Sequence, residues 1–298
     1  MASPQILSRL AALAAALLFS TGGAVIKATS LTAWQVAGFR SGVAAAALLL
    51  LLPASRRGWS RRVPLAAAAY AGTMVLFVAA NKLTTAANAI FLQSASPLYL
   101  LLVGPLLLGE RVRAHDLTVM ALIAAGMLLF FAGEPPQAAT APDPFRGNLC
   151  GALSGICWAF TVAGLRWLES RDGPGAGMPM VAAGNAMAFL FCLPPALPVR
   201  AAEVSDWLAV GYLGLFQIGL AYVCLTCAVR RLPALETSLL LLAEPALNPV
   251  WAWFVHKENP GGWALAGGAL ILAATLATAL QKGDRRIFRA PAKLDTGS

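Results

Sequence analysis

The chain has 298 residues, of which 59% are hydrophobic and 12% are charged, and its formal net charge is +9. Its mean hydropathy is +0.71. These values exclude a water-soluble domain of this length and indicate that lipid is the solvent.

Ten apolar stretches follow one another along the chain. A hydrocarbon core about 30 Å thick needs roughly 20 apolar residues in a helix. Transmembrane β-strands are excluded because the stretches are continuously apolar rather than alternating. The predicted spans are residues 8–26, 33–52, 64–81, 84–106, 114–132, 146–168, 177–197, 206–228, 234–255 and 261–281. We therefore predict an all-α integral membrane protein with ten transmembrane helices.

Residues 84–112 and 232–260 are similar segments, separated by 148 positions. The match pairs Lys82 with Arg230, Ser96 with Glu244, Pro97 with Pro245 and Glu110 with Glu258. Because five helices is an odd number, a second five-helix copy must insert upside down relative to the first. We expect two inverted five-helix repeats around a central cavity. The predicted units are residues 1–132, a periplasmic linker at 133–145, the second repeat at 146–281 and a basic cytoplasmic tail at 282–298.

Basic residues are distributed unevenly between the two sides of the predicted topology. Sixteen lie on the side of the N-terminus: Arg9, Arg56, Arg57, Arg61, Arg62, Arg111, Arg113, Arg166, Arg171, Arg230, Arg231, Lys282, Arg285, Arg286, Arg289 and Lys293. Five lie on the other side: Lys27, Lys82, Arg146, Arg200 and Lys257. The positive-inside rule therefore predicts that both termini are cytoplasmic. Arginines that follow alternate loops need no nucleic-acid partner to explain them.

Sequence motifs for nucleotide hydrolysis and zinc-dependent catalysis are missing from the sequence. It contains no G-x-x-x-x-G-K-[ST] phosphate loop and no H-E-x-x-H zinc motif. Cys224 and Cys227 form a C-x-x-C inside a predicted helix, which favours packing over a redox or metal site. Gly147, Gly151 and Gly155 form a flat ridge for close helix packing. We expect no enzymatic activity, no cofactor and no metal.

Polar side chains at membrane depth are costly and therefore point to a cavity. Glu244 is the sharpest case, and two interpretations stay open for it. It either forms a structural ion pair with Arg40, a buried charge in the second predicted helix, or handles substrate or protons. The other polar groups also have a structural alternative, since they often bond a backbone carbonyl. The predicted substrate-binding residues are Phe77, Asn81, Ser96, Tyr99, Trp158, Gln217, Tyr222, Glu244 and Asn248.

Pro97 and Pro245 lie at matching depths of the two similar helices. Each removes a backbone hydrogen bond and is expected to kink its helix. Matching kinks are either hinges for alternating access or static features that shape the bundle.

Several short motifs in the chain resemble those of a known protein family. They are Gly38-Phe39-Arg40, Gly109-Glu110-Arg111, Trp158-Ala159, Ala243-Glu244-Pro245 and Lys257-Glu258. Together with the ten-helix pattern they resemble the EamA-type drug/metabolite transporters. The resemblance implies a basket-like inverted-repeat bundle in the bacterial inner membrane that exports small metabolites by alternating access without ATP. His256 and Lys257 depart from the small or apolar residues that the family has before the second acidic exit.

Within this family the chain is most similar to amino acid exporters of the YddG type. That similarity implies that the cargo is an aromatic or other neutral amino acid. It also implies that the central residues of the cavity are Phe77, Asn81, Tyr99, Trp158 and Glu244. The alternatives are another metabolite or drug, such as a nucleoside or sugar phosphate, moved outward or inward. A non-transporting membrane protein is the remaining class. Ten helices can enclose a cavity without a partner, so we expect a monomer in the lipid bilayer.

Overall fold

The structure is a computed structural model that describes residues 4–96, 98–100, 114–132, 139–173, 175–229, 231–232 and 234–287. The regular elements of these residues are helices, which confirms the all-α class. The first half contains α1 (Pro4–Ser20), α2 (Gly22–Ala28), α3 (Ala33–Leu51), the 3₁₀ turn η1 (Pro53–Arg56), α4 (Val63–Leu83), α5 (Ala86–Ser94) and α7 (Ala114–Ala132).

The second half contains α8 (Pro144–Asp172), α9 (Gly177–Ala196), α10 (Val204–Tyr212), the π-helical segment η2 (Leu213–Leu220), α11 (Ala221–Val229), α12 (Ala234–Leu241), α13 (Ala243–His256) and α14 (Gly261–Ile287). Polar side chains mark several helix starts by accepting orphan backbone N–H groups. Thr32 accepts from Gln35 N ahead of α3, Thr85 from Asn88 N ahead of α5, and Asp143 from Arg146 N ahead of α8.

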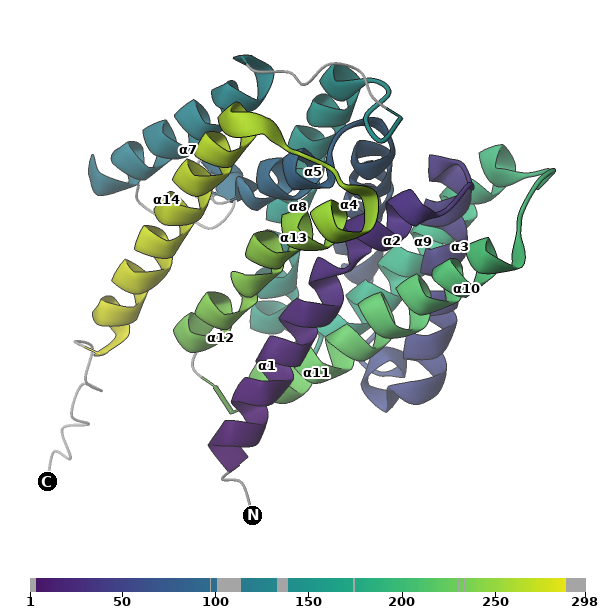
Figure 1. The fold of residues 1–298 in the computed structure, drawn as a ribbon. Coiled ribbons are helices and arrows are strands. Elements are labelled where there is room, and N and C mark those ends of the chain that lie inside the picture. Colours follow the sequence, from purple (N-terminus) through teal and green to yellow (C-terminus); the bar gives the residue numbers. More distant parts are fainter. Residues whose placement is uncertain are drawn as a thin grey trace, which may run out of the picture.

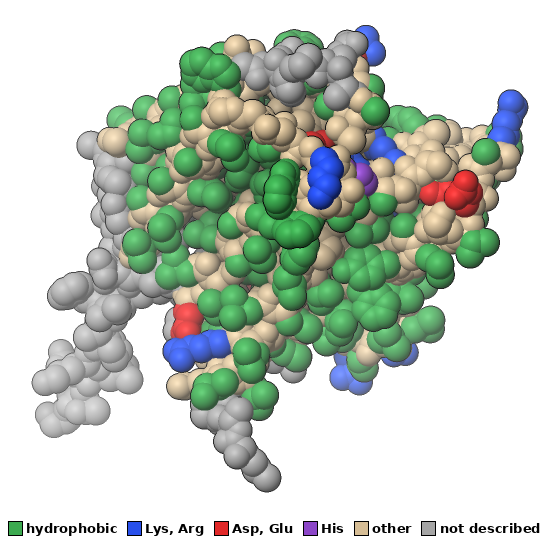
Figure 2. Space-filling model, viewed as in Figure 1, with side chains coloured by type: hydrophobic (Ala, Val, Ile, Leu, Met, Phe, Trp, Pro, Cys, Tyr) green, Lys and Arg blue, Asp and Glu red, His purple; other side chains and the backbone are tan. Residues whose placement is uncertain are grey.

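Six helical stretches of the described residues are long and apolar enough to cross a membrane. They are Gln5–Ala28, Ala33–Leu51, Val63–Leu83, Pro144–Glu169, Gly177–Ala196 and Val204–Ala228. Hydrophobic side chains are spread across the visible face, with few charged side chains between them (Figure 2). Leu50, Leu65 and Leu208 are more than two-thirds exposed. A surface of this kind needs lipid around it, because soluble monomers do not expose such large apolar areas.

The helices that contain the two similar segments, residues 84–112 and 232–260, are both interrupted. α5 ends at Ser94 with a turn at Ala95, and a turn at Leu242 separates α12 from α13. Leu242 corresponds to Ser94 in the repeat, so the two interruptions fall within one residue of equivalent positions. The predicted span 84–106 is described only as far as Leu100. The expected kink at Pro97 lies outside the described residues.

Helices of the two halves interleave in the bundle (Figure 1). α4 packs on α8 and α9, α3 packs on α9, α1 packs on α11, and α7 packs on α14. The first turn of α1 and the last turn of α14 lie on the same side of the molecule (Figure 1). This interleaving places residues from both halves around a common centre.

The predicted glycine ridge packs α8 tightly against α5. A Cβ added to Gly155 would lie 2.9 Å from the carbonyl oxygen of Leu92, and one added to Gly151 would lie 3.2 Å from the Leu92 Cβ. Only residues without a side chain permit this approach. The packing role predicted for the ridge is confirmed.

Candidate functional site

A cavity of about 140 Å³ lies among helices of both halves. α1, α3, α4 and α5 supply its wall from the first half, and α8, η2, α11, α12 and α13 supply it from the second. Its lining residues are Phe19, Arg40, Tyr70, Met74, Phe77, Ile90, Gln93, Ser94, Trp158, Gln217, Ile218, Tyr222, Leu225, Leu241, Glu244 and Pro245. The cavity therefore combines an apolar wall with a few polar groups, as small-molecule sites do.

Larger hollows elsewhere have a different chemistry. One lies between Phe39 and Trp207, and another between Phe160 and Trp167. Both are lined by aliphatic and aromatic side chains without a charged group. Such surfaces suit lipid chains, so the charged central cavity is the candidate site.

Glu244 reaches the cavity from the first turn of α13, directly after the interruption at Leu242. Pro245 has no N–H to donate to the Leu241 carbonyl four residues earlier, which explains the break between α12 and α13. Leu242 N instead bonds the Leu239 carbonyl at 3.2 Å in a tighter turn. Among the described residues, no ion pair joins the Glu244 carboxylate to a basic side chain. The carboxyl group of Glu244 therefore faces the cavity without a basic partner among the described residues.

Arg40 lines the same cavity from α3 and is 1% exposed. Its guanidinium donates to the Met74 carbonyl at 3.1 Å and to Gln217 Oε1 at 3.4 Å. The ion pair with Glu244, one of the two interpretations from sequence, is not formed in this structure. The two opposite charges instead occupy one cavity without neutralising each other, because Arg40 is held by neutral acceptors on α4 and η2.

Aromatic rings form much of the remaining wall. Phe19 and Tyr222 meet edge to face with 5.3 Å between ring centroids, and Tyr70 lies 6.2 Å from Tyr222. Phe77 and Trp158 complete this set. Phe19 and Tyr70 line the cavity but were not predicted from the sequence. The first and sixth predicted helices can be aligned so that Phe19 matches Trp158, and this weak match is a usable signal for Phe19. Tyr70 stands in an alanine-rich segment with no distinguishing pattern.

Five of the predicted binding residues lie together at the cavity: Phe77, Trp158, Gln217, Tyr222 and Glu244. Gln217 reaches it from η2, a π-helical segment of a kind that often occurs at functional sites.

The other four predicted residues do not line this cavity. Asn81 and Asn248 are fully buried beside Gly23, where a Cβ would lie 2.9 Å and 2.7 Å from their carboxamide oxygens. Ser96 is buried, and the Tyr99 hydroxyl lies 3.7 Å from the Met127 sulfur. Asn248 lies one turn after Glu244 in the same helix, α13, and it packs against Gly23 of α2 instead of lining the cavity.

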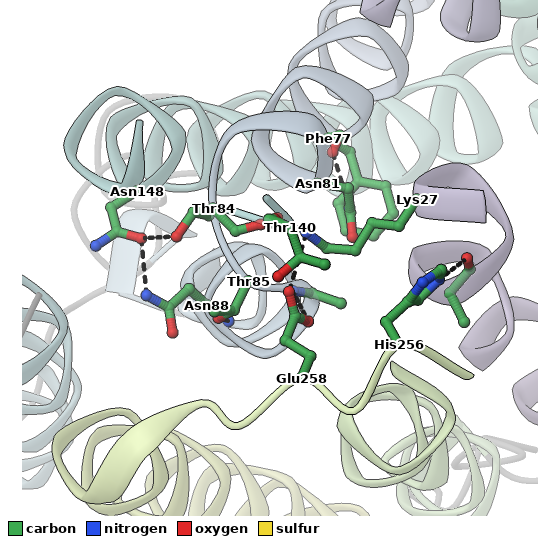
Figure 3. A network of polar contacts seen from close by, with 12 residues as sticks. Lys27, Phe77, Asn81, Thr84, Thr85, Asn88, Thr140, Asn148, His256 and Glu258 are labelled. Carbon is green, nitrogen blue, oxygen red and sulfur yellow. Dashed lines mark hydrogen bonds and ion pairs between the residues drawn. The ribbon is translucent and has the colours of Figure 1, made fainter. Parts of the chain in front are cut away.

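A second group of buried polar residues lies at the end of the bundle where α2 and α13 finish, which we call the Lys27 end (Figure 3). Lys27 Nζ lies 3.0 Å from Glu258 Oε1 and donates to the carbonyls of Thr84 and Thr140. Glu258 Oε2 accepts from Ala86 N at 2.8 Å. These contacts join α2, α4, α5 and the residues before α8 to the segment that follows α13.

An amide cluster extends the Lys27 end toward α8 (Figure 3). The Asn148 side-chain oxygen accepts from Thr84 Oγ1 and from Asn88 Nδ2, each at 2.9 Å. The two residues that depart from the family pattern also act here. His256 Nε2 lies 2.8 Å from the Ala24 carbonyl, and Lys257 closes α13 in the left-handed conformation, with φ of 54°. His256 therefore links the end of α13 to α2.

Cys224 and Cys227 are free thiols on α11, one half-buried and the other exposed. No group of three or more metal-ligating side chains comes together among the described residues. Neither cysteine contributes to the central cavity.

The chain matches known proteins over nearly its full length. Residues 7–132 and 145–280 each match the model of the EamA-like transporter family. The aromatic amino acid exporter YddG of Ancylobacter novellus is 26% identical over 214 residues, which is 71% of this chain and 73% of that protein. The pseudopaline exporter CntI of Pseudomonas aeruginosa is 26% identical over 284 residues, which is 92% of this chain and 96% of that protein.

One protein of known crystal structure superposes with a TM-score of 0.60 at 20% sequence identity. The superposition covers 94% of this chain and 98% of the other. At this identity the likeness supports the fold alone.

Proposed function

Since the chain belongs to the EamA-like transporter family, we propose that it exports small zwitterionic metabolites, with aromatic and other neutral amino acids as the first candidates. The observation that carries this proposal is the cavity between the two halves, where Glu244 stands among aromatic rings. A carboxylate suits a cargo ammonium group, and aromatic walls suit an apolar side chain.

The proposed architecture is ten spans in two inverted halves, with residues 1–132 and 146–281 as the repeats and both termini in the cytoplasm. The equivalent interruptions at Ala95 and Leu242 support the repeat. The excess of basic residues beside the N-terminus supports the orientation, as does the common side of the first and last described turns. This topology places the Lys27 end in the periplasm.

Transport follows from bending at the two interrupted helices. Each interruption lies next to a proline and to the cavity, since Ser94 and Pro245 both line the wall. A helix that has already lost backbone hydrogen bonds at one turn bends there at low cost. We propose that Pro97 and Pro245 act as paired hinges that open the cavity to one side at a time. We also propose a monomer as the transporting unit, because residues of a single chain line the cavity.

Cavity size and charge favour amino acids over the other cargo classes. Its volume of about 140 Å³ is below the roughly 300–1,000 Å³ of pockets for drug-sized ligands, which favours a small cargo in this conformation. Arg40 is the one basic side chain among the described lining residues. A sugar-phosphate carrier needs several cations to hold its anion.

Ligand-induced stabilisation of the purified protein tests the cargo class, because a ligand that binds the folded state raises the melting temperature. The panel contains phenylalanine, tryptophan, leucine, uridine and glucose 6-phosphate. We expect the amino acids, led by the aromatic ones, to raise the melting temperature in a saturable manner. A response to uridine or glucose 6-phosphate alone would contradict the proposed cargo and leave the family assignment intact.

A further inference from the structure

We infer that Arg40 binds the carboxylate of the cargo while Glu244 binds its amine, so that the cavity selects molecules that carry both groups. This assignment rests on the proposed function and deepens it, because it distinguishes amino acids from simple amines and simple acids. It also replaces the structural role of Arg40 as the partner of Glu244 with a role in binding.

The first support is the surroundings of Arg40. Its side chain is 1% exposed and lines the cavity. Its hydrogen-bond acceptors among the described residues are the Met74 carbonyl, the Met74 sulfur and Gln217 Oε1, all of them neutral. Its Nε–H has no acceptor among the described residues. A fully buried guanidinium is thus left without a carboxylate and with one donor unused.

This arrangement is costly unless a ligand completes it. A buried charge needs an opposite charge or strong hydrogen bonds to offset its lost hydration. A guanidinium presents a rigid fork of N–H donors that matches the two oxygens of a carboxylate. A cargo carboxylate in the cavity that Arg40 lines would supply the opposite charge that the described residues do not provide.

The second support is the position of Gln217. Its side chain extends from the π-helical segment η2, and its oxygen accepts from Arg40 Nη1 at 3.4 Å. Gln217 Nε2 is oriented by the Phe19 carbonyl at 3.5 Å. The neutral amide thus holds the guanidinium in place without cancelling its charge, which leaves the charge for a ligand.

The third support is the charge balance of the whole cavity. The described lining residues include one basic side chain, Arg40, and one acidic side chain, Glu244, which form no ion pair with each other. A zwitterion neutralises both charges at once. An amine alone would leave Arg40 uncompensated, and a carboxylic acid alone would leave Glu244 uncompensated.

Equilibrium binding to the purified full-length protein tests this assignment through two matched ligand series. The first series is phenylalanine, phenethylamine and 3-phenylpropionate. The second is leucine, isopentylamine and 4-methylpentanoate. Each analogue loses one charged group and keeps the apolar side chain. We expect wild-type protein to bind both truncated analogues at least about tenfold more weakly than the amino acid, since a charged hydrogen bond is lost.

Two cavity variants separate the groups. Arg40→Gln should weaken phenylalanine binding at least about tenfold and leave phenethylamine binding unchanged. Gln217→Glu places a carboxylate next to Arg40, so it should compete with the cargo carboxylate and weaken phenylalanine in the same way. Arg200→Gln changes an exposed arginine outside the cavity and is the matched control. Because the wild-type ligand series needs no substitution, the test stands even if Arg40→Gln does not fold.

Equal binding of phenylalanine and phenethylamine by the wild type would overturn the assignment of Arg40. The proposal that the cavity binds a cargo through its amino group would then still stand. Phenylalanine binding that is unchanged in both cavity variants would do the same. Binding of neither amino acid by folded wild-type protein would instead overturn the proposed function, and the inference with it.

Discussion

Lys27 and Glu258 form an ion pair between the two halves of the chain, with 3.0 Å between Nζ and Oε1 and side chains only 4% and 3% exposed. The other oxygen of the same carboxylate accepts from Ala86 N at the start of α5. Glu258 therefore holds the ends of α2 and α5 together (Figure 3). Separating α13 from these helices would remove the partners of two buried charges.

Removal of one member of this pair should destabilise the protein strongly. Glu258→Gln leaves the Lys27 ammonium buried without its counter-charge, and breaking such a pair costs about 3–5 kcal/mol. Unfolding in detergent, followed by the melting temperature, measures the loss. Replacing both members by apolar residues, as in Lys27→Met with Glu258→Leu, should restore much of the stability. Equal losses in the single and double variants would contradict the pair as the cause.

The glycine ridge of α8 gives a second prediction about stability. Gly155→Ala places a Cβ 2.9 Å from the Leu92 carbonyl oxygen, so α5 and α8 must separate. Overpacking of this kind typically costs about 1–3 kcal/mol. Gly211→Ala is the matched control, because a Cβ there meets no atom within 4 Å inside α10. A melting temperature lowered equally by both variants would argue against the close approach.

A surface link between α4 and α8 should respond to acid. Asp172 accepts from Ser60 Oγ at 2.6 Å and pairs with Arg62 at 2.5 Å. The Ser60 hydrogen bond, followed by the Arg62 guanidinium, lowers the pKa of Asp172 below its usual value. A lowered pKa contributes stability that is present above the unfolded value of about 3.9 and is lost as pH falls through the folded value.

The Asp172→Asn variant checks this link. Its melting temperature should be lower than that of the wild type at about pH 7, and the difference should shrink toward about pH 3. A difference that stays constant across this range would show that the carboxylate charge does not stabilise the link.

Six of the ten predicted spans are found among the described residues, and they were predictable because their cause is local. About 20 apolar residues in a row specify a helix in lipid whatever surrounds it. The described stretches Ala33–Leu51 and Gly177–Ala196 agree closely with the predicted 33–52 and 177–197. The helix break before Pro245 was also predictable, since it follows from the missing N–H of proline.

The cavity was predictable only in part, because its wall depends on how broken helices rotate and pack. Glu244 and Trp158 stand in motifs that the sequence displays, and both line the wall. Asn248 follows Glu244 by one turn of α13, as the helical periodicity predicts, but it is buried against Gly23 of α2, a tertiary contact that periodicity does not reveal. Tyr70 contributes through α4 packing against α8 and α9, which no local pattern reveals.

Glu244 is expected to be essential for transport and dispensable for folding. Glu244→Gln keeps the shape of the side chain and removes the charge that attracts the cargo amine. We expect uptake per protein to fall at least about tenfold, as for loss of a charged hydrogen bond, with little change in melting temperature. Glu203→Gln, at an exposed carboxylate, is the control. Unchanged uptake in Glu244→Gln would remove this residue from the site.

Uptake of radiolabelled phenylalanine by liposomes that contain the purified protein, without ATP, tests the central claim most directly. The account predicts saturable, protein-dependent flux that unlabelled neutral amino acids compete with and that Glu244→Gln suppresses. Comparison with and without a pH gradient shows whether protons are exchanged for the cargo. An absence of flux for every neutral amino acid, from protein shown to be folded, would contradict the account.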